Sequence, residues 1–204
     1  MMDIEQVMRL APVVPVIVVD ELAHAVPLAE ALVAGGLRAL EVTLRTPAAL
    51  DAIAAMKQVP GAVVGAGTVT NPRELDAALA AGAEFVVSPG LTEPLAKAAI
   101  GAGVPFLPGT ANASDIMRGL DLGLTHFKFF PAATSGGLPA LKALAAPFGQ
   151  CLFCPTGGIG PDNAAEWLAF KPVLCVGGSW VAPRGVPERP SIEALAREAC
   201  QLRP

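Results

Sequence analysis

The stretch that decides the fold is "ALEVTLRTPAALDAIAAMKQVPGAVVGAGTV", residues 39–69. Two short apolar runs, 39–44 and 62–69, enclose a segment whose apolar residues recur at helical spacing. Thr46 is the predicted N-cap of this helix, because its hydroxyl can accept a backbone hydrogen bond and a proline follows it. A strand, a helix and a second strand in so short a span predict a parallel β–α–β unit.

The same unit recurs along the chain. Helical patterns lie between the apolar runs, and Asn71, also followed by a proline, is a second predicted N-cap. The runs begin roughly 20 to 26 residues apart, which is the length of a minimal strand-and-helix unit. They start at eight residues: Val13, Ala39, Ala62, Phe85, Pro105, His126, Leu152 and Val173.

Eight such units without a long linker predict one domain over residues 1–204, an α/β protein with a (β/α)8 TIM barrel. The segment "DIEQVMRLA" predicts an extra N-terminal helix before the first strand. The alternative is an open doubly wound sheet, whose first turn carries G-x-G-x-x-G. Here "GAGTVT" has only half of that motif and follows the third run, so the barrel is favoured.

Alternation along each strand predicts which side chains face the barrel interior. Leu40 and Val42 suit the layer against the helices, so their polar neighbours face inward. In "HFKFFP", Phe127 and Phe129 are predicted to pack outward. The inward set predicted by this reasoning combines charged, polar and small residues: Glu41, Thr43, Arg45, Val64, Ala66, Thr68, Lys128 and Phe130.

Lys128 is the strongest catalytic candidate. Burying an ammonium group is expensive, and a buried ion pair is seldom better for stability than apolar packing. An amine attacks a carbonyl only as the free base, which the dry surroundings of Phe129, Phe130 and Pro131 favour. Glu41 then supplies the proton transfers. The alternative reading is a structural ion pair; His126, at the start of the same strand, is expected to be structural.

Two glycine loops are candidates for binding a phosphate. "PTGGI" follows the seventh predicted strand and "VGGSW" follows the eighth. Loops after these strands form phosphate sites in many such barrels, because glycine lets backbone amides approach the anion. The predicted cradle is Gly157, Gly158, Gly178 and Ser179, with tight turns as the alternative explanation.

Composition limits the remaining functions. A net charge of −4 without basic runs argues against a nucleic-acid surface. The early apolar run is broken by Pro12 and Pro15, and it lacks the features of a membrane span or signal peptide, so we expect a cytoplasmic protein. Cys151 and Cys154 are predicted to lie on opposite faces of a strand as inert thiols. With two histidines, no metal site is expected.

Six motifs occur in order and carry a resemblance: "LEVTLR", "VGAGTV", "SPGLTE", "FKFFPA", "FCPTGG" and "GGSW". Together they cover nearly the whole chain, which closely resembles the class I 2-keto-3-deoxy-6-phosphogluconate (KDPG) aldolases, lysine-dependent (β/α)8 barrels. The resemblance implies reversible cleavage of KDPG, a keto-acid sugar phosphate, to pyruvate and glyceraldehyde 3-phosphate. It also implies a cytoplasmic homotrimer that needs no cofactor or metal.

The resemblance also implies a role for individual residues. Lys128 matches the Schiff-base lysine, and Glu41 matches the acid/base residue that works through a water. The other matches bind the pyruvyl carboxylate (Arg45 and Thr68), form pocket walls (Pro89 and Phe130), or hold the distal part and the phosphate of the substrate (Thr156, Gly157, Gly158 and Ser179).

Two departures and three alternatives accompany this resemblance. Ala133 stands where the family usually has Glu, and "PGTAN" stands where it usually has "PGIST". The same lysine chemistry could act on 2-keto-4-hydroxyglutarate (KHG) or on the galactonate epimer of KDPG. A non-covalent epimerase or decarboxylase would use Glu41 and Lys128 as acid and base. A non-catalytic barrel would only bind a sugar phosphate.

Overall fold

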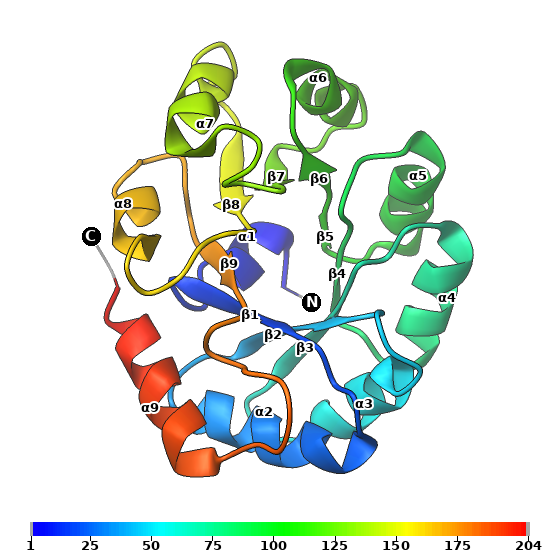
Figure 1. Cartoon of the computed structure of the whole chain (residues 1–204). Helices are drawn as coiled ribbons and strands as arrows, with labels where there is room; N and C mark the ends of the chain where they lie inside the picture. Colours follow the sequence, from blue (N-terminus) through cyan, green and yellow to red (C-terminus); the bar gives the residue numbers. More distant parts are fainter. Residues whose placement is uncertain (1, 203–204) are drawn as a thin grey trace.

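In the computed structural model, which describes residues 2–202, strands and helices alternate along the chain. Figure 1 shows the strands around the centre of the molecule, with α2 to α9 outside them. The strands are β1 (Val13–Ile17), β2 (Ala39–Thr43), β3 (Val63–Gly67), β4 (Phe85–Val87), β5 (Phe106–Leu107), β6 (Gly109–Thr110), β7 (His126–Phe129), β8 (Leu152–Pro155) and β9 (Val176–Gly178). The helices are α1 (Ile4–Met8), the 3-10 turn η1 (Leu22–His24), α2 (Ala25–Ala34), α3 (Ala49–Met56), α4 (Pro72–Ala80), α5 (Glu93–Ala102), α6 (Ala113–Asp121), α7 (Gly137–Ala145), α8 (Ala164–Leu168) and α9 (Arg189–Cys200).

The strands form a curled parallel sheet. Six strands pair in the order β5-β4-β3-β2-β1-β9, and three pair in the order β6-β7-β8. Single bridges, Phe153 with Val173 and Thr156 with Gly177, join β8 to the segment of β9. Pro108 interrupts the fifth predicted strand because proline has no N–H to donate, although its carbonyl accepts from Lys128 N at 2.8 Å. The predicted α/β class is confirmed.

One of the two predicted helix caps is present. The Asn71 side chain accepts from Glu74 N at 3.0 Å, and α4 begins with the following proline. The prediction for Thr46 was wrong, because α3 begins at Ala49 with Ala48 as its N-cap residue. The Thr46 hydroxyl instead donates to the carbonyl of Val19 and so ties this loop to the end of the first strand.

Two apolar clusters lie on the two faces of the strands. Leu40, Phe127 and Phe129 belong to the cluster that packs against the helices, as predicted. The other cluster includes residues at or near the starts of strands, such as Ala39 and Phe85, together with Val7 and Met8 of α1. Figure 1 shows α1 near the centre of the molecule, among the strands. Helix α1 therefore covers the amino ends of the strands.

The predicted orientation of β3 was wrong for two residues. Val64 and Ala66 lie in the outer cluster, against the helices. Val63 belongs to the inner cluster, and Gly65 and Gly67 alternate with it along the strand. The prediction counted back from Thr68, but that residue follows the strand with a φ of +59°, which breaks the alternation.

Cys151, Cys154 and Cys175 are buried free thiols. Cys151 lies in the outer cluster and Cys154 in the inner one, as their odd separation predicts. A hydrogen bond with Cys154, together with burial, raises the pKa of the Cys175 thiol well above its usual value. Burial likewise raises the pKa of Cys151, so these thiols are poor nucleophiles.

Candidate active site

Lys128 and Glu41 meet on the inner side of the curled sheet. Each is the third residue of its strand, on β7 and β2, which are not neighbours in either sheet. Lys128 Nζ donates to Glu41 Oε1 at 3.0 Å, and the two residues are only 4% and 2% exposed. Lys128 Nζ also lies 5.3 Å from the centre of the Phe130 ring. The structure therefore holds a buried amine and a carboxylate in direct contact beside an aromatic face.

Arg45 and Thr68 meet where their strands end. Arg45 follows β2 by two residues, Thr68 follows β3 directly, and Arg45 Nε donates to Thr68 Oγ1 at 3.3 Å. A hydrogen bond of 2.9 Å from Leu44 N to Gly67 O connects the two strand ends. Arg45 is exposed, so its guanidinium can reach an anion in solution.

The two predicted phosphate loops lie side by side. The bridge between Thr156 and Gly177 joins the end of β8 to β9. Gly157 and Gly158 have φ angles of +103° and +74°, which L side chains rarely adopt. Ala133 N donates to Gly157 O at 3.0 Å, so the segment after β7 is fastened to the same loop. Gly178 is the last residue of β9, and Ser179 follows it at the same end.

The other two predicted pocket residues lie beside the Lys128 strand. Gly109 pairs with Lys128 across β6 and β7, and it packs directly against the backbone of Pro89. Thr156 is buried, and its hydroxyl donates to Cys154 O at 3.4 Å. Every predicted site residue thus lies within its strand or just after it, at the end away from α1.

Comparison with known proteins decides the family. The family model described as "KDPG and KHG aldolase" matches residues 4–197. The chain belongs to this family. The 2-dehydro-3-deoxy-phosphogluconate aldolase of Zymomonas mobilis is 62% identical over 199 residues, which cover 98% of this chain and 96% of that protein.

Two solved structures of KDPG aldolases are similar over nearly their full length. The Z. mobilis enzyme with 3-phosphoglycerate has a TM-score of 0.97 and 61% identity, covering 98% of this chain and 96% of that one. The Legionella pneumophila enzyme, with pyruvate captured at low pH as a covalent carbinolamine, has a TM-score of 0.95 and 45% identity, covering 98% and 99%.

Sequence reasoning missed residues that shape this aldolase-family site. Asn163 Oδ1 accepts from Gly160 N at 3.0 Å, and its Nδ2 donates to Gly158 O at 3.1 Å, so one side chain holds the loop after β8. The Trp180 ring packs against Gly178, where a Cβ would lie 2.7 Å from its Cη2. The sequence offered a signal for each, because Asn163 follows the glycine loop and Trp180 ends the "GGSW" motif.

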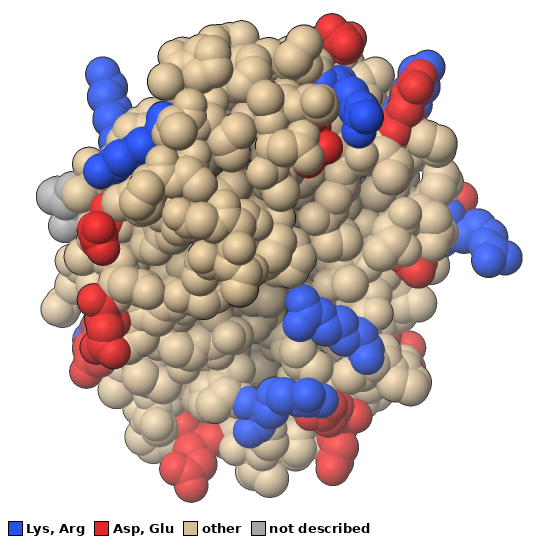
Figure 2. All heavy atoms as spheres, turned by 45° about the horizontal axis from the view of Figure 1, so that its top comes forward, with Lys and Arg blue, Asp and Glu red and all other residues tan. Residues whose placement is uncertain are grey.

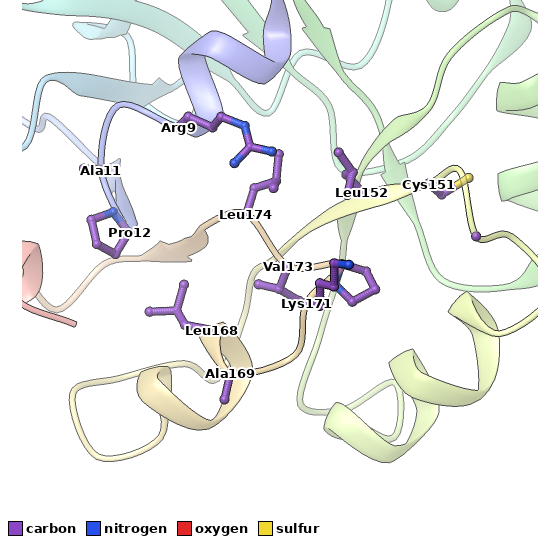
Figure 3. Close-up of a pocket in the computed structure, with 12 residues that line it drawn as sticks. Arg9, Ala11, Pro12, Cys151, Leu152, Leu168, Ala169, Lys171, Val173 and Leu174 are labelled. Carbon is purple, nitrogen blue, oxygen red and sulfur yellow. The ribbon is translucent and has the colours of Figure 1, made fainter. Parts of the chain in front are cut away.

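A cavity lies away from these residues, near the amino ends of β1 and β8 (Figure 3). Its volume is about 980 Å³, and within residues 2–202 the charged residues that line it are Arg9 and Lys171. None of the predicted site residues lines it. Figure 2 shows a hollow in the middle of one face of the molecule, with basic side chains beside it.

Residues 2–202 contain no group of three or more His, Cys, Asp or Glu residues that could hold a metal ion. Among the same residues, every helix is too short or too polar to cross a membrane.

Proposed function

We propose that this chain is a class I aldolase that reversibly cleaves KDPG to pyruvate and glyceraldehyde 3-phosphate. The observation that carries the proposal is the buried hydrogen bond of 3.0 Å between Lys128 Nζ and Glu41 Oε1. The names of the relatives support it, and pyruvate bound as a carbinolamine in the L. pneumophila enzyme is the adduct that an amine forms with a ketone.

Lys128 forms the covalent intermediate in this proposal. Its neutral Nζ attacks the C2 carbonyl of the substrate, and the oxygen takes up a proton to give a carbinolamine. Loss of water from the carbinolamine gives an iminium ion. Glu41, in contact with Nζ, moves the protons in these steps, working through a water as the family resemblance implies.

The iminium then accepts the electrons of the bond that breaks. The C4 hydroxyl loses its proton to a base, its oxygen forms the aldehyde carbonyl, and the C3–C4 electron pair moves toward the iminium nitrogen to give an enamine. Protonation of the enamine at C3 and hydrolysis of the new iminium release pyruvate and restore Lys128. The reverse sequence forms the C–C bond.

The strand ends hold the two ends of the substrate. Arg45, with Thr68, binds the pyruvyl carboxylate, because a guanidinium matches a carboxylate in charge and geometry. Backbone amides around the glycine loops bind the phosphate. Their residues are Gly157, Gly158, Gly178 and Ser179, while Pro89, Phe130 and Thr156 form walls between the two ends.

KHG is a second candidate substrate, because the description of the matching family names both KDPG and KHG. KHG shares the pyruvyl half, so Lys128 and Arg45 act on it as they do on KDPG. KHG lacks the phosphate, so the glycine loops do not contribute to its binding. The galactonate epimer of KDPG differs at one carbon and keeps the phosphate.

Rates of pyruvate release from KDPG, KHG and the galactonate epimer test this proposal. We expect kcat/KM to be highest for KDPG and to survive a metal chelator. Conversion of a sugar phosphate without pyruvate release would instead indicate an epimerase or a decarboxylase. Binding without turnover of any substrate would indicate a non-catalytic barrel, and either result would overturn the proposed function.

We also propose a closed (β/α)8 barrel with α1 as an extra N-terminal helix. The two β8–β9 bridges and the continuation of β5 into β6 support closure, because they link the two hydrogen-bonded sheets at both edges. A cytoplasmic homotrimer is proposed on the resemblance alone. Sedimentation of the purified chain tests the trimer.

A further inference from the structure

Glu41 leans along its strand toward the end that holds the site. Its Cα pairs with that of Gly65 on β3, but its carboxylate lies over Gly67, two residues further on. Two residues of strand correspond to about 6 to 7 Å. This lean brings Oε1 to Lys128 Nζ.

The carboxylate can lie there because residue 67 has no side chain. A Cβ on Gly67 would lie 2.6 Å from Glu41 Cγ, 2.8 Å from Cδ and closer still to Oε1. Real Cβ atoms essentially never approach a neighbour to less than 3.0 Å. Gly67 lies in β3 and is absent from the residues with positive φ, so its backbone would accept alanine. The three nearest atoms that such a Cβ would meet all belong to Glu41.

We infer that Gly67 is a positioning residue, whose missing side chain fixes the Glu41 carboxylate beside Lys128. The inference rests on the proposed aldolase function. Gly67→Ala should displace the carboxylate and lower kcat by about 10²-fold, the loss typical of a misplacement of about 1 Å. KM should change by less than about threefold, because the displaced group acts in the chemical step.

Gly65 supplies a matched control on the same strand and the same face. A Cβ there would lie 2.5 Å from atoms of the Phe85 ring, in the apolar cluster that includes α1 residues. Gly65→Ala should therefore lower the melting temperature by overpacking, while kcat stays within about threefold. The pH dependence of kcat should change in Gly67→Ala and not in Gly65→Ala.

The decisive measurement compares Gly67→Ala in two backgrounds, wild type and Glu41→Ala. Exchange of the pyruvate methyl hydrogens in D2O, followed by NMR, reports enamine formation even when turnover is slow. We expect the Gly67→Ala loss in the wild-type background to disappear once Glu41 is alanine, because the side chain that collides is gone. An equal loss in both backgrounds would overturn the inference.

The outcomes separate this inference from the proposed function. If wild type neither cleaves KDPG nor catalyses exchange, the proposed function fails. If wild type and Gly65→Ala are active and the Gly67→Ala loss does not depend on Glu41, only the inference fails. If Gly67→Ala does not fold, melting temperature is the readout: recovery of folding in the Glu41→Ala double variant supports the inference, and no recovery overturns it.

Discussion

Strand β7 carries two basic side chains, His126 and Lys128, two residues apart, and each contacts a glutamate. His126 Nε2 lies 3.4 Å from Oε2 of Glu5 in α1, an ion-pair distance without hydrogen-bond geometry. Lys128 Nζ lies 3.0 Å from Oε1 of Glu41 in β2. The first pair lies at the amino end of the strand and is partly exposed, whereas the second is buried among the strands.

The two pairs differ in their position along the strand, and the chemistry that we propose belongs to the pair further from α1. At the amino end of the strand, His126 lies beside α1, whose residues Val7 and Met8 belong to the inner apolar cluster. At the other end, the strands run into the loops that carry Arg45 and the glycine cradle. Barrel enzymes place their chemistry at the carboxyl ends of their strands, and the proposed site lies at these ends.

Removing the amine of Lys128 should have the largest effect. Lys128→Met should lower kcat/KM for KDPG by at least about 10³-fold, because the covalent route is lost. Steady-state kinetics measures this loss. Lys142→Met is the matched control, since Lys142 is exposed on α7, and it should keep full activity.

Folding of the Lys128 variant needs its own control. Lys128→Met leaves the buried Glu41 carboxylate without its cation, which destabilises the folded state. Adding Glu41→Gln removes that charge and should raise the free energy of unfolding, measured with urea, while activity stays absent. Activity in either variant would contradict the assigned role of Lys128.

Truncating Arg45 should have an intermediate effect. Arg45→Ala should raise KM for KDPG roughly 10- to 100-fold, the range expected when a hydrogen bond to a charged group is lost. Arg38 is a matched control, because it donates to Gly61 O at 2.9 Å near the start of β3. Arg38→Ala should leave KM unchanged, and an equal rise in both variants would show that the effect is not local.

Changing His126 should have the smallest effect on catalysis and a clear effect on the pH dependence of stability. Burial lowers the pKa of His126 below its usual 6.5, against the opposing influence of Glu5. The folded state then binds fewer protons than the unfolded state, so its stability is full above about pH 6.5 and falls as pH drops below it.

His126→Gln should remove that fall between pH 6.5 and 5 while leaving kcat within about twofold. Asp3, Glu5 and Arg9 also face this histidine. The hydrogen bond to Arg9 lowers the pKa of Glu5 below 4.5, so Glu5 changes its charge only below the pH range in which His126 does. Urea unfolding at several pH values measures the change. An unchanged pH dependence would contradict the assigned burial of His126.

Much of this arrangement could be predicted from the sequence. The spacing of apolar residues predicted the parallel α/β class and the positions of seven strands. The remaining predicted strand, the fifth along the chain, is split into β5 and β6 at Pro108. Lys128 stood out because alternation placed it between two outward phenylalanines. Alternation also placed Glu41 on the inward face of β2.

The rest depended on contacts between distant segments. The sequence could not show that Thr68 adopts a positive φ, and this reversed the predicted faces of Val64 and Ala66. As an incomplete G-x-G-x-x-G motif, "GAG" was set aside, and its pattern did not reveal that Gly65 and Gly67 make room for Phe85 and Glu41. Such steric relations arise only when strands pair in register.

Trapping with pyruvate and borohydride tests the central claim most directly. The protein is incubated with pyruvate, reduced with sodium borohydride and digested, and the modified peptide is mapped by mass spectrometry. The account predicts one reduced pyruvyl adduct, on Lys128, and none in the Lys128→Met variant. No adduct in wild type, or an adduct on another lysine such as Lys142 or Lys171, would contradict it.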